Sequence, residues 1–296
     1  MITAFTVRAV SPVPIRFDVY TGYSVRGIFF NLLGRANSEL ASAIHTANTL
    51  SPYSTSVLET ARQGMLFQGT VTAGETFKFR VGCLDDKVAD AIGRAMTSMW
   101  PPIFPVRNSE AMIMEVSVSF WTPSQKVEVE EGMKVEVRFL TPTNFRSTQH
   151  NPGILRRILP SRFRRSVRPV YRYVILPDPY YLFRGLARLY RRFGDPRIRY
   201  SSYCEWLLEG GIALETFSDL KVHKVFDAKG RWARGFTGKV VYAMPGDTFD
   251  RKYAELTMRL LKFARFSNVG GNRTAGFGVI DYRVMLRGDD EGAGHR

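Results

Sequence analysis

Histidines and a glycine-rich loop are the parts of this sequence whose residue types could perform chemistry. Imidazole transfers protons well near neutral pH because its pKa lies close to that range. The loop at residues 268–282 reads NVGGNRTAGFGVIDY and carries four glycines around Arg273: Gly270, Gly271, Gly276 and Gly278. Glycine allows positive φ and close approach to a ligand, and bare amides beside an arginine suit phosphate oxygens. A nucleotide, an RNA or a tight structural turn could each use such a loop.

A strong positive charge narrows this choice. The chain has 42 lysines and arginines against 27 acids, a net charge of +15, which points to a polyanion or an anionic surface as partner. Residues 146–199 hold 14 arginines, no lysine and only two acids, interleaved with tyrosines and phenylalanines. Guanidinium groups fork onto phosphates, and aromatic rings stack on unpaired bases, so this segment suits single-stranded or looped RNA. A solvated basic face and a membrane-surface helix remain the alternatives.

The order of expected elements repeats along the chain. Hydrophobic periodicity predicts two successive sets of strands and helices. In the first set, strands are expected at 2–10, 54–60, 63–71, 75–83 and 111–120, and helices at 21–36, 38–45 and 85–100. In the second set, strands are expected at 133–143, 217–226, 234–244 and 275–287, and helices at 179–193 and 249–266. The glycine-rich loop therefore joins the last helix to the last strand.

This order predicts an α+β fold made of tandem ferredoxin-like (RRM-like, βαββαβ) domains. We expect an N-terminal ferredoxin-like domain at residues 1–125 and a C-terminal one at residues 130–287, which contains the arginine-rich insertion and the glycine-rich loop. Residues 288–296 are polar and glycine-rich, and we expect them to form a disordered tail.

Composition also excludes several classes of protein. The first ten residues, MITAFTVRAV, alternate and carry Arg8, so they indicate a strand and not a signal peptide. No apolar stretch approaches the roughly 18 residues that cross a bilayer. Cys83 and Cys204 are isolated, without metal-ligand or disulfide spacing. We therefore expect a cytoplasmic protein with no membrane partner, no metal site and no cofactor.

Four segments resemble a known family. FSNVGGNRTAGFGVIDY, following a basic helix, resembles the signature glycine-rich loop of the RAMP superfamily, the ferredoxin-like RNA-binding proteins of CRISPR systems. The other three are ARGFTGKVVYAMP (233–245), VEVRFLTPT (135–143) and GYSVRGIFFNLLGRANSELASAIHTANTLSPYSTSVL (22–58). Together they resemble the repeat-processing endoribonucleases of archaeal type, the sixth family of CRISPR-associated proteins.

The resemblance implies an activity and its partners. Members of the family bind CRISPR repeat RNA and cut the precursor transcript without a metal ion. The ribose 2′-OH attacks its own 3′ phosphate, which leaves crRNAs with 2′,3′-cyclic phosphate and 5′-OH ends. Subunits of a CRISPR effector complex and a second copy of the chain in a homodimer are further candidate partners.

The resemblance also selects candidate site residues. From its position alone, His45 is a helix cap, but the family match makes it the catalytic candidate. Relatives often have a tyrosine where Phe30 stands and a lysine near Ser51, so Arg26 and Tyr23 are added as catalytic candidates. The predicted RNA-binding residues are Arg35, Arg162, Arg164, Arg165, Arg168, Arg231, Arg234, Gly270, Gly271, Arg273, Gly276 and Gly278. Among them, Arg273 is the best candidate for a phosphate contact.

Two other classes of function stay open. The chain could be a non-catalytic RAMP subunit that binds RNA in an effector complex, since such subunits share the glycine-rich loop. It could also be an unrelated tandem ferredoxin-like enzyme that binds a nucleotide. The second alternative requires phosphate-binding glycines in front of a helix, and the sequence has none.

Overall fold

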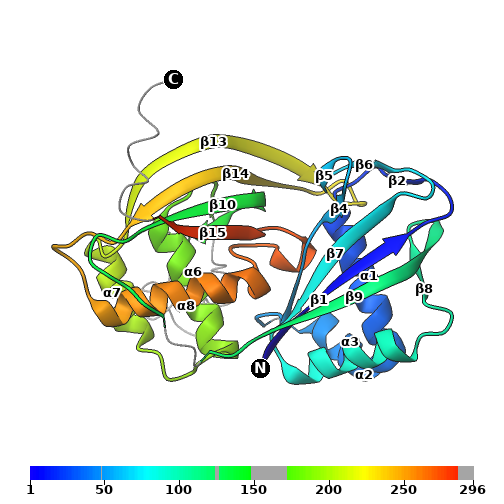
Figure 1. Cartoon of the computed structure of the whole chain (residues 1–296), viewed down its shortest axis with the longest axis horizontal. Helices are drawn as coiled ribbons and strands as arrows, with labels where there is room; N and C mark the ends of the chain where they lie inside the picture. Colours follow the sequence, from blue (N-terminus) through cyan, green and yellow to red (C-terminus); the bar gives the residue numbers. More distant parts are fainter. Residues whose placement is uncertain (48, 124–126, 148–171, 286–296) are drawn as a thin grey trace, which may run out of the picture.

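The molecule has two units, each a sheet with helices packed on it (Figure 1). The computed structural model describes residues 1–47, 49–123, 127–147 and 172–285. Strands of the N-terminal unit follow the order β5-β4-β7-β1-β9-β8, with β3 also paired to β7, and those of the C-terminal unit follow the order β13-β14-β10-β15. The two units lie side by side along the long axis of the molecule.

The N-terminal unit contains strands from the first 121 residues and the first three helices. Its helices are α1 (Thr21–Ala36), α2 (Ser38–Thr46) and α3 (Asp86–Ser98). Its strands are β1 (Ile2–Val10), β2 (Ile15–Phe17), β3 (Tyr53–Thr55), β4 (Leu58–Thr60), β5 (Gly64–Leu66), β6 (Gly69–Val71), β7 (Thr76–Cys83), β8 (Ile103–Val106) and β9 (Ser109–Trp121).

The C-terminal unit has its helices below the sheet in the view of Figure 1. They are α6 (Pro179–Phe193), α7 (Tyr200–Leu208) and α8 (Arg251–Ser267), with a short 3₁₀ turn, η1 (Arg273–Ala275). The strands are β10 (Lys134–Thr143), β11 (Phe145–Ser147), β12 (Arg172–Val174), β13 (Ala213–Phe226), β14 (Trp232–Ala243) and β15 (Ile280–Met285).

Both sheets have the strand order of a ferredoxin-like domain. In each, the first strand lies in the middle between the third and the last, as β1 lies between β7 and β9 and β10 lies between β14 and β15. All of these pairs are antiparallel. The predicted α+β class and tandem ferredoxin-like architecture are confirmed, and the predicted domain boundary falls between β9 and β10.

Helices α1 and α2 carry the candidate catalytic residues, and their sequences explain their positions. Helix α1 buries an apolar stripe against the N-terminal sheet, formed by Val25, Ile28, Phe29, Leu32 and Leu33. Helix α2 starts where the Asn37 side chain accepts a hydrogen bond of 2.9 Å from the Leu40 amide. It buries none of its own residues. Leu40, Ala41 and Ile44 pack half-buried against the N-terminal core, and the other side chains of α2, including His45, are exposed to solvent.

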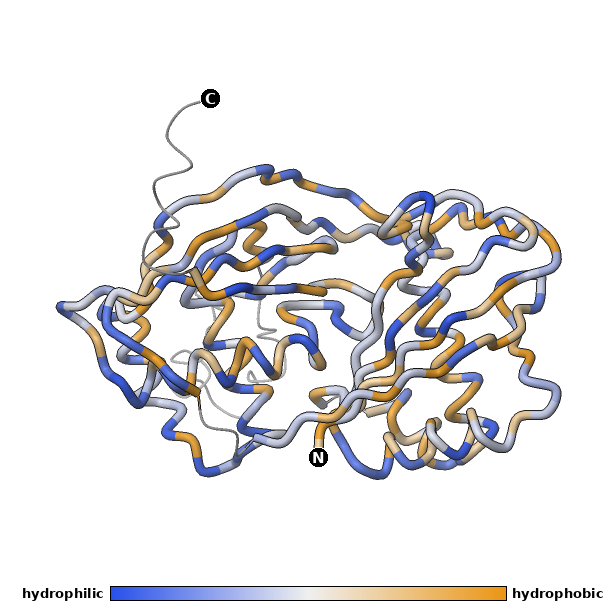
Figure 2. The backbone as a smooth tube through the Cα atoms, viewed as in Figure 1, coloured by the Kyte–Doolittle hydropathy of each residue, from blue (hydrophilic) through white to orange (hydrophobic). Residues whose placement is uncertain are grey.

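A long hairpin connects the two units. Strands β13 and β14 extend beyond the C-terminal helices, and their tip lies beside β4 and β5 in Figure 1. The Tyr20 amide donates to the Phe226 carbonyl over 3.3 Å. Tyr20 and Val57 from one unit form an apolar cluster with Val225 and Phe277 from the other. Hydrophobic and hydrophilic residues alternate along this hairpin in Figure 2, as expected for strands with one covered and one open face.

The structure corrects several predicted bounds. The last strand was predicted to start at residue 275, but β15 begins at Ile280 because residues 273–275 form η1 and Gly276 and Gly278 adopt positive φ of 77° and 68°. The segments 54–60 and 63–71 are divided into the short strands β3 to β6. The sequence did not predict β8 or α7.

Candidate functional site

The glycine-rich loop is held against the N-terminal unit by Asn268. This residue is fully buried, with φ of 55°. Its side-chain nitrogen donates to the carbonyls of Thr55, Arg273 and Phe277 over 2.7, 3.2 and 3.1 Å. Its side-chain oxygen accepts a bond of 3.0 Å from Arg80, and burial lowers the pKa of that guanidinium to about 10. Asn268 thus ties the loop to strands β3 and β7.

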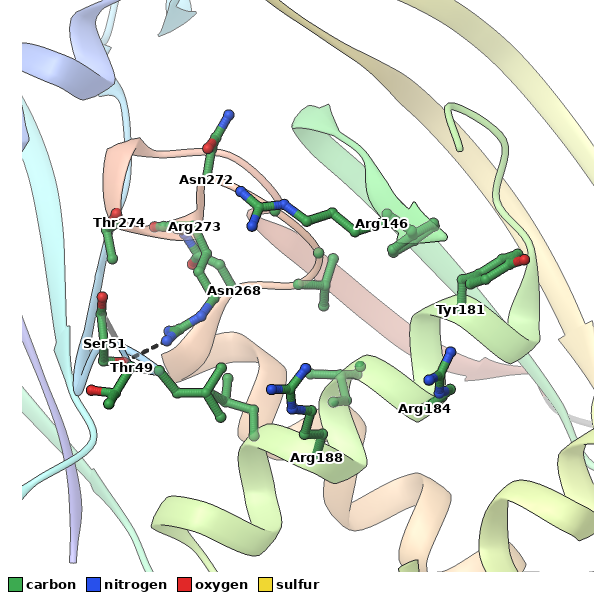
Figure 3. A pocket seen from close by; sticks show the side chains of 18 of the residues that line it. Thr49, Ser51, Arg146, Tyr181, Arg184, Arg188, Asn268, Asn272, Arg273 and Thr274 are labelled. Atoms are coloured by element: carbon green, nitrogen blue, oxygen red, sulfur yellow. Dashed lines mark hydrogen bonds between the residues drawn. The ribbon is translucent and has the colours of Figure 1, made fainter. Parts of the chain in front are cut away.

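Arg273 reinforces the same contact from inside the loop. Its buried guanidinium donates to the Tyr53 carbonyl over 3.1 Å, to the Ser267 carbonyl over 3.2 Å and to the Ser51 carbonyl. Figure 3 shows this side chain directed at Ser51 and away from the arginines of the opposite wall. Burial lowers its pKa to about 10. Because three backbone carbonyls already occupy the guanidinium, the phosphate contact predicted for Arg273 remains a prediction that its position does not favour.

Three of the loop glycines are required by close packing. A Cβ on Gly276 would lie 2.9 Å from the Ser56 carbonyl oxygen, and a Cβ on Gly278 would overlap the Val269 carbonyl. Both have positive φ, which glycine alone adopts without strain. Of the three uses that the sequence allowed for this loop, the structural turn accounts for these two glycines. Gly270 has the same requirement, since its φ is 72° and its Cβ would overlap the Asn144 carbonyl. Both Gly270 and Gly271 also line a cavity.

The cavity lies between the two units and has a volume of about 480 Å³. One side is formed by residues 268–274 and by residues 49–51, which follow α2, and the other by β11 and α6. Arg146, Arg184 and Arg188 extend toward it, and Asn272 lies across from them on the loop (Figure 3). No acidic side chain is among the described residues that line it. We call this cavity the arginine cleft, and its chemistry suits a polyanion.

The sequence did not single out these arginines within its basic segment. Arg184 and Arg188 are four residues apart on α6, and residues with this spacing share one helix face. This spacing is the feature of the sequence that could have identified Arg184 and Arg188 as neighbours on one surface. Arg146 lies on β11, a strand of three residues that the periodicity did not predict. The arginines predicted from the same segment, Arg162, Arg164, Arg165 and Arg168, lie outside the described residues, as does the predicted tail at 288–296.

Two predicted catalytic residues, Arg26 of α1 and His45 of α2, contact the phenyl ring of Phe30 on α1. The guanidinium carbon of Arg26 lies 5.8 Å from the centre of the Phe30 ring. The ring of His45 meets the same phenyl ring edge-on at 5.3 Å. His45 is exposed near the end of α2, and the cleft-lining residues 49–51 follow shortly after it. An imidazole and a permanent cation are therefore both available beside Phe30.

Tyr53 lies between the Phe30 ring and the glycine-rich loop. Tyr53 was not among the candidate site residues predicted from the sequence. Its ring stacks on Phe29 at 3.9 Å and lies 5.7 Å from Phe30. Burial raises the pKa of its phenol, and the neighbouring side chains of Arg26 and Thr274 oppose that rise only in part. Tyr53 therefore stays protonated between a residue of α1 and a residue of the loop.

Tyr23 lies farther along the same helix, toward the hairpin. Seven residues separate it from Phe30, which corresponds to about 10 Å along a helix. Burial and the nearby Asp227 carboxylate raise the pKa of its phenol. Asp227 is paired with Arg231 over 2.6 Å. Tyr23 thus belongs to the surroundings of the hairpin tip, and the structure does not bring it to His45.

The other three predicted arginines, Arg35, Arg231 and Arg234, lie outside the arginine cleft. Arg35 donates to the Ile103 carbonyl over 3.3 Å and lines a second cavity of about 460 Å³ together with Trp100. Arg234 lies over the ring of Trp232, with its guanidinium carbon 5.1 Å from the ring centre. In the described part of the chain, no three His, Cys, Asp or Glu side chains gather in a way that could hold a metal ion. None of the described helices is long and apolar enough to cross a membrane.

A comparison with protein-family models gives one match. Residues 137–280 match the family described as CRISPR-associated endoribonuclease Cas6. These residues belong to the Cas6 family. The match covers β15 only at its start but includes α6, the β13–β14 hairpin, α8 and the glycine-rich loop. The family that the four sequence segments indicated is confirmed.

Solved Cas6 structures share the fold over nearly the whole chain. A Thermus thermophilus Cas6 in a product complex is 24% identical, with a TM-score of 0.72, over 96% of this chain and 100% of that one. A second Cas6 product complex is 19% identical, with a TM-score of 0.66, over 97% of this chain and 100% of that one. A structure described as a RAMP protein binding different RNA substrates is 11% identical, with a TM-score of 0.57, over 96% of this chain and 100% of that one. A comparison with curated proteins gives no match.

The position of Arg273 predicts that its replacement affects stability first. Arg273→Met should lower the free energy of unfolding by about 2–4 kcal/mol, because the buried carbonyls of Tyr53 and Ser267 and the half-buried carbonyl of Ser51 lose their donor. Arg146→Met is the matched control, since Arg146 is exposed on the other wall of the arginine cleft. It should change that free energy by less than about 0.5 kcal/mol. Chemical denaturation measures both, and equal effects would show that Arg273 has no special structural role.

Proposed function

We propose that this protein binds CRISPR repeat RNA and cuts the precursor transcript without a metal ion, leaving 2′,3′-cyclic phosphate and 5′-OH ends. The observation that carries this proposal is that the exposed His45 ring and the Arg26 guanidinium both contact Phe30. The arginine cleft follows a few residues after His45 along the chain. Membership of an endoribonuclease family supports it.

The reaction needs three groups, and this chain can supply them from its own side chains. The ribose 2′ oxygen loses its proton and forms a bond to phosphorus, and the bond from phosphorus to the 5′ oxygen breaks as that oxygen takes up a proton. The His45 imidazole transfers one of these protons, a role that suits an exposed histidine near neutral pH. Arg26 stabilises the negative charge that grows on the phosphate, since a guanidinium keeps its charge at any physiological pH.

Binding of the RNA is assigned to the arginine cleft. Arg146, Arg184 and Arg188 offer forked donors for consecutive phosphates. Two structures of this fold are described as Cas6 product complexes, which supports the assignment. The arginines predicted at 162–168 extend the same basic segment and are proposed to add phosphate contacts.

A binding-only function is the second candidate, and Phe30 is the observation in its favour. The ring between Arg26 and His45 has no hydroxyl, whereas relatives often have a tyrosine there. If cleavage depended on that hydroxyl, the chain would act as an RNA-binding RAMP subunit. Incubation with repeat RNA separates the two functions, because only the endoribonuclease produces a single cut.

Metal removal and a modified substrate test the proposed chemistry. Cleavage of a transcript of the CRISPR repeat from the source genome should continue at the same rate in EDTA. A single 2′-deoxy nucleotide at the cut site should abolish cleavage, because the attacking hydroxyl is missing, and a 2′-deoxy nucleotide elsewhere should not. Activity that EDTA removes and Mg²⁺ restores would contradict the proposed chemistry.

Replacement of His45 tests its role as the proton-transfer group. His45→Ala should slow single-turnover cleavage by roughly 10²–10⁴-fold with little change in RNA affinity, since one positioned acid or base contributes about that much. Ser42→Ala, which changes another exposed residue of α2, should leave both quantities unchanged. If His45→Ala cut at the wild-type rate, the imidazole would have no part in the reaction, and Arg26 would become the main candidate.

A further inference from the structure

The tip of the β13–β14 hairpin presents an aromatic and cationic surface that the proposed reaction does not use. Phe226 is 38% exposed and Trp232 is 56% exposed. They face each other in the strand register, and the neighbouring pair is Lys224 with Arg234. Since directly paired residues of antiparallel strands share a face, these four side chains form one patch. We call it the hairpin platform.

The opposite face of the hairpin is covered by the N-terminal unit. Val225 is buried in the cluster with Tyr20 and Val57, and Ala233 packs against the same cluster. The ring of His223 meets Phe67 edge-on at 5.3 Å. Side chains alternate between the two faces of a strand, so docking of His223 and Val225 directs Lys224 and Phe226 to solvent. The hairpin platform is therefore held in a fixed orientation and is not a mobile loop tip.

Cations lie directly against the two rings. The ammonium of Lys224 is 5.0 Å from the centre of the Phe226 ring and 5.3 Å from that of Trp232. The guanidinium carbon of Arg234 is 5.1 Å from the Trp232 ring centre. The adjacent carboxylate, Asp227, is bound to Arg231 over 2.6 Å and so does not cancel these charges. An occupant of this patch should be flat, aromatic and anionic.

A nucleotide with an unstacked base has this combination. Its base can stack on an exposed aromatic ring while its phosphates lie beside the lysine and the arginine. Both faces of a base inside a duplex are already stacked, so duplex RNA offers the hairpin platform only its phosphates. The hairpin platform therefore suits single-stranded RNA better than duplex RNA. It also suits RNA better than an apolar protein surface, for which two exposed cations would be unfavourable.

We propose that the hairpin platform stacks an unpaired base of the bound RNA on Trp232 and Phe226, with Lys224 and Arg234 on the flanking phosphates. The inference rests on the proposed RNA-binding function and adds to it a site for single-stranded RNA separate from the arginine cleft. The hairpin platform lies at the far end of the hairpin, beside β4 and β5 in Figure 1.

Binding of labelled oligoadenylate, alone and paired with oligouridylate, tests this site by fluorescence anisotropy. Trp232→Ala should weaken single-strand binding by about 5- to 100-fold, the effect of losing one stacked base. Trp232→Phe should restore most of the affinity because it restores a ring. Binding of the duplex should change less than twofold in both variants. Phe217→Ala is the matched control, since Phe217 is also an exposed phenylalanine of β13 but lies away from the tip, and it should bind as wild type.

The outcomes separate the hairpin platform from the function on which it rests. A wild-type protein that binds neither of these RNAs nor a transcript of the CRISPR repeat would contradict the proposed function itself. A wild-type protein that binds the repeat transcript but not oligoadenylate would overturn the hairpin platform alone. A wild-type protein that binds both the single strand and the duplex, with Trp232→Ala unchanged on the single strand, would overturn the hairpin platform and leave the arginine cleft as the binding site. Equal losses on single strand and duplex would also overturn it, because a charge effect and not stacking would then explain the change. Photocrosslinking of 4-thiouridine RNA should label residues 226–234 when Trp232 stacks a base.

Discussion

The arrangement of the whole molecule depends on polar groups that are buried where the two ferredoxin-like units meet. A buried amide or guanidinium without partners costs free energy, so each such group restricts the backbone around it to positions that supply acceptors. Asn268 and Arg273 together bind carbonyls from β3, from the end of α8 and from the loop itself. The glycine-rich loop can satisfy all of them only when it lies against β3. Gly276 and Gly278 permit that approach, since a Cβ at either position would meet backbone atoms.

The contact between the loop and β3 also positions the candidate catalytic side chains relative to the arginine cleft. Thr274, in the loop, neighbours the Tyr53 phenol, and Tyr53 in turn neighbours Arg26 and Phe30. The ring of His45 meets the same Phe30 ring edge-on. The loop also forms one wall of the arginine cleft. The docked loop therefore fixes the position of His45, in the N-terminal unit, relative to the cleft arginines of the C-terminal unit. The docked hairpin fixes a second relation, between the hairpin platform and helix α1.

The sequence predicted those parts of the structure that local patterns determine. The bounds of α1 and α6 were predicted correctly because each has an uninterrupted amphipathic pattern, and α6 also begins at a capping aspartate. The role of Arg273 could not be predicted, since its partner Tyr53 lies 220 residues away in the chain. Tyr53 sits in a short, polar stretch that marks no residue as special. The late start of β15 could not be predicted for the same reason. Residues 273–275 form η1 where the loop contacts the N-terminal unit, and the local hydrophobic pattern does not indicate that long-range contact.

Native-state hydrogen exchange measures most directly whether the glycine-rich loop is stably docked on the N-terminal unit. We expect the amides of residues 51–57 and 266–280 to exchange slowly and together, with an opening free energy close to that of β7 and β10, because the loop cannot leave β3 without exposing buried polar groups. Mass spectrometry of the corresponding peptides resolves the two segments. If residues 266–280 exchanged within seconds while β7 and β10 remained protected, the loop would be a flexible segment, and Asn268 and Arg273 would not hold the two units together.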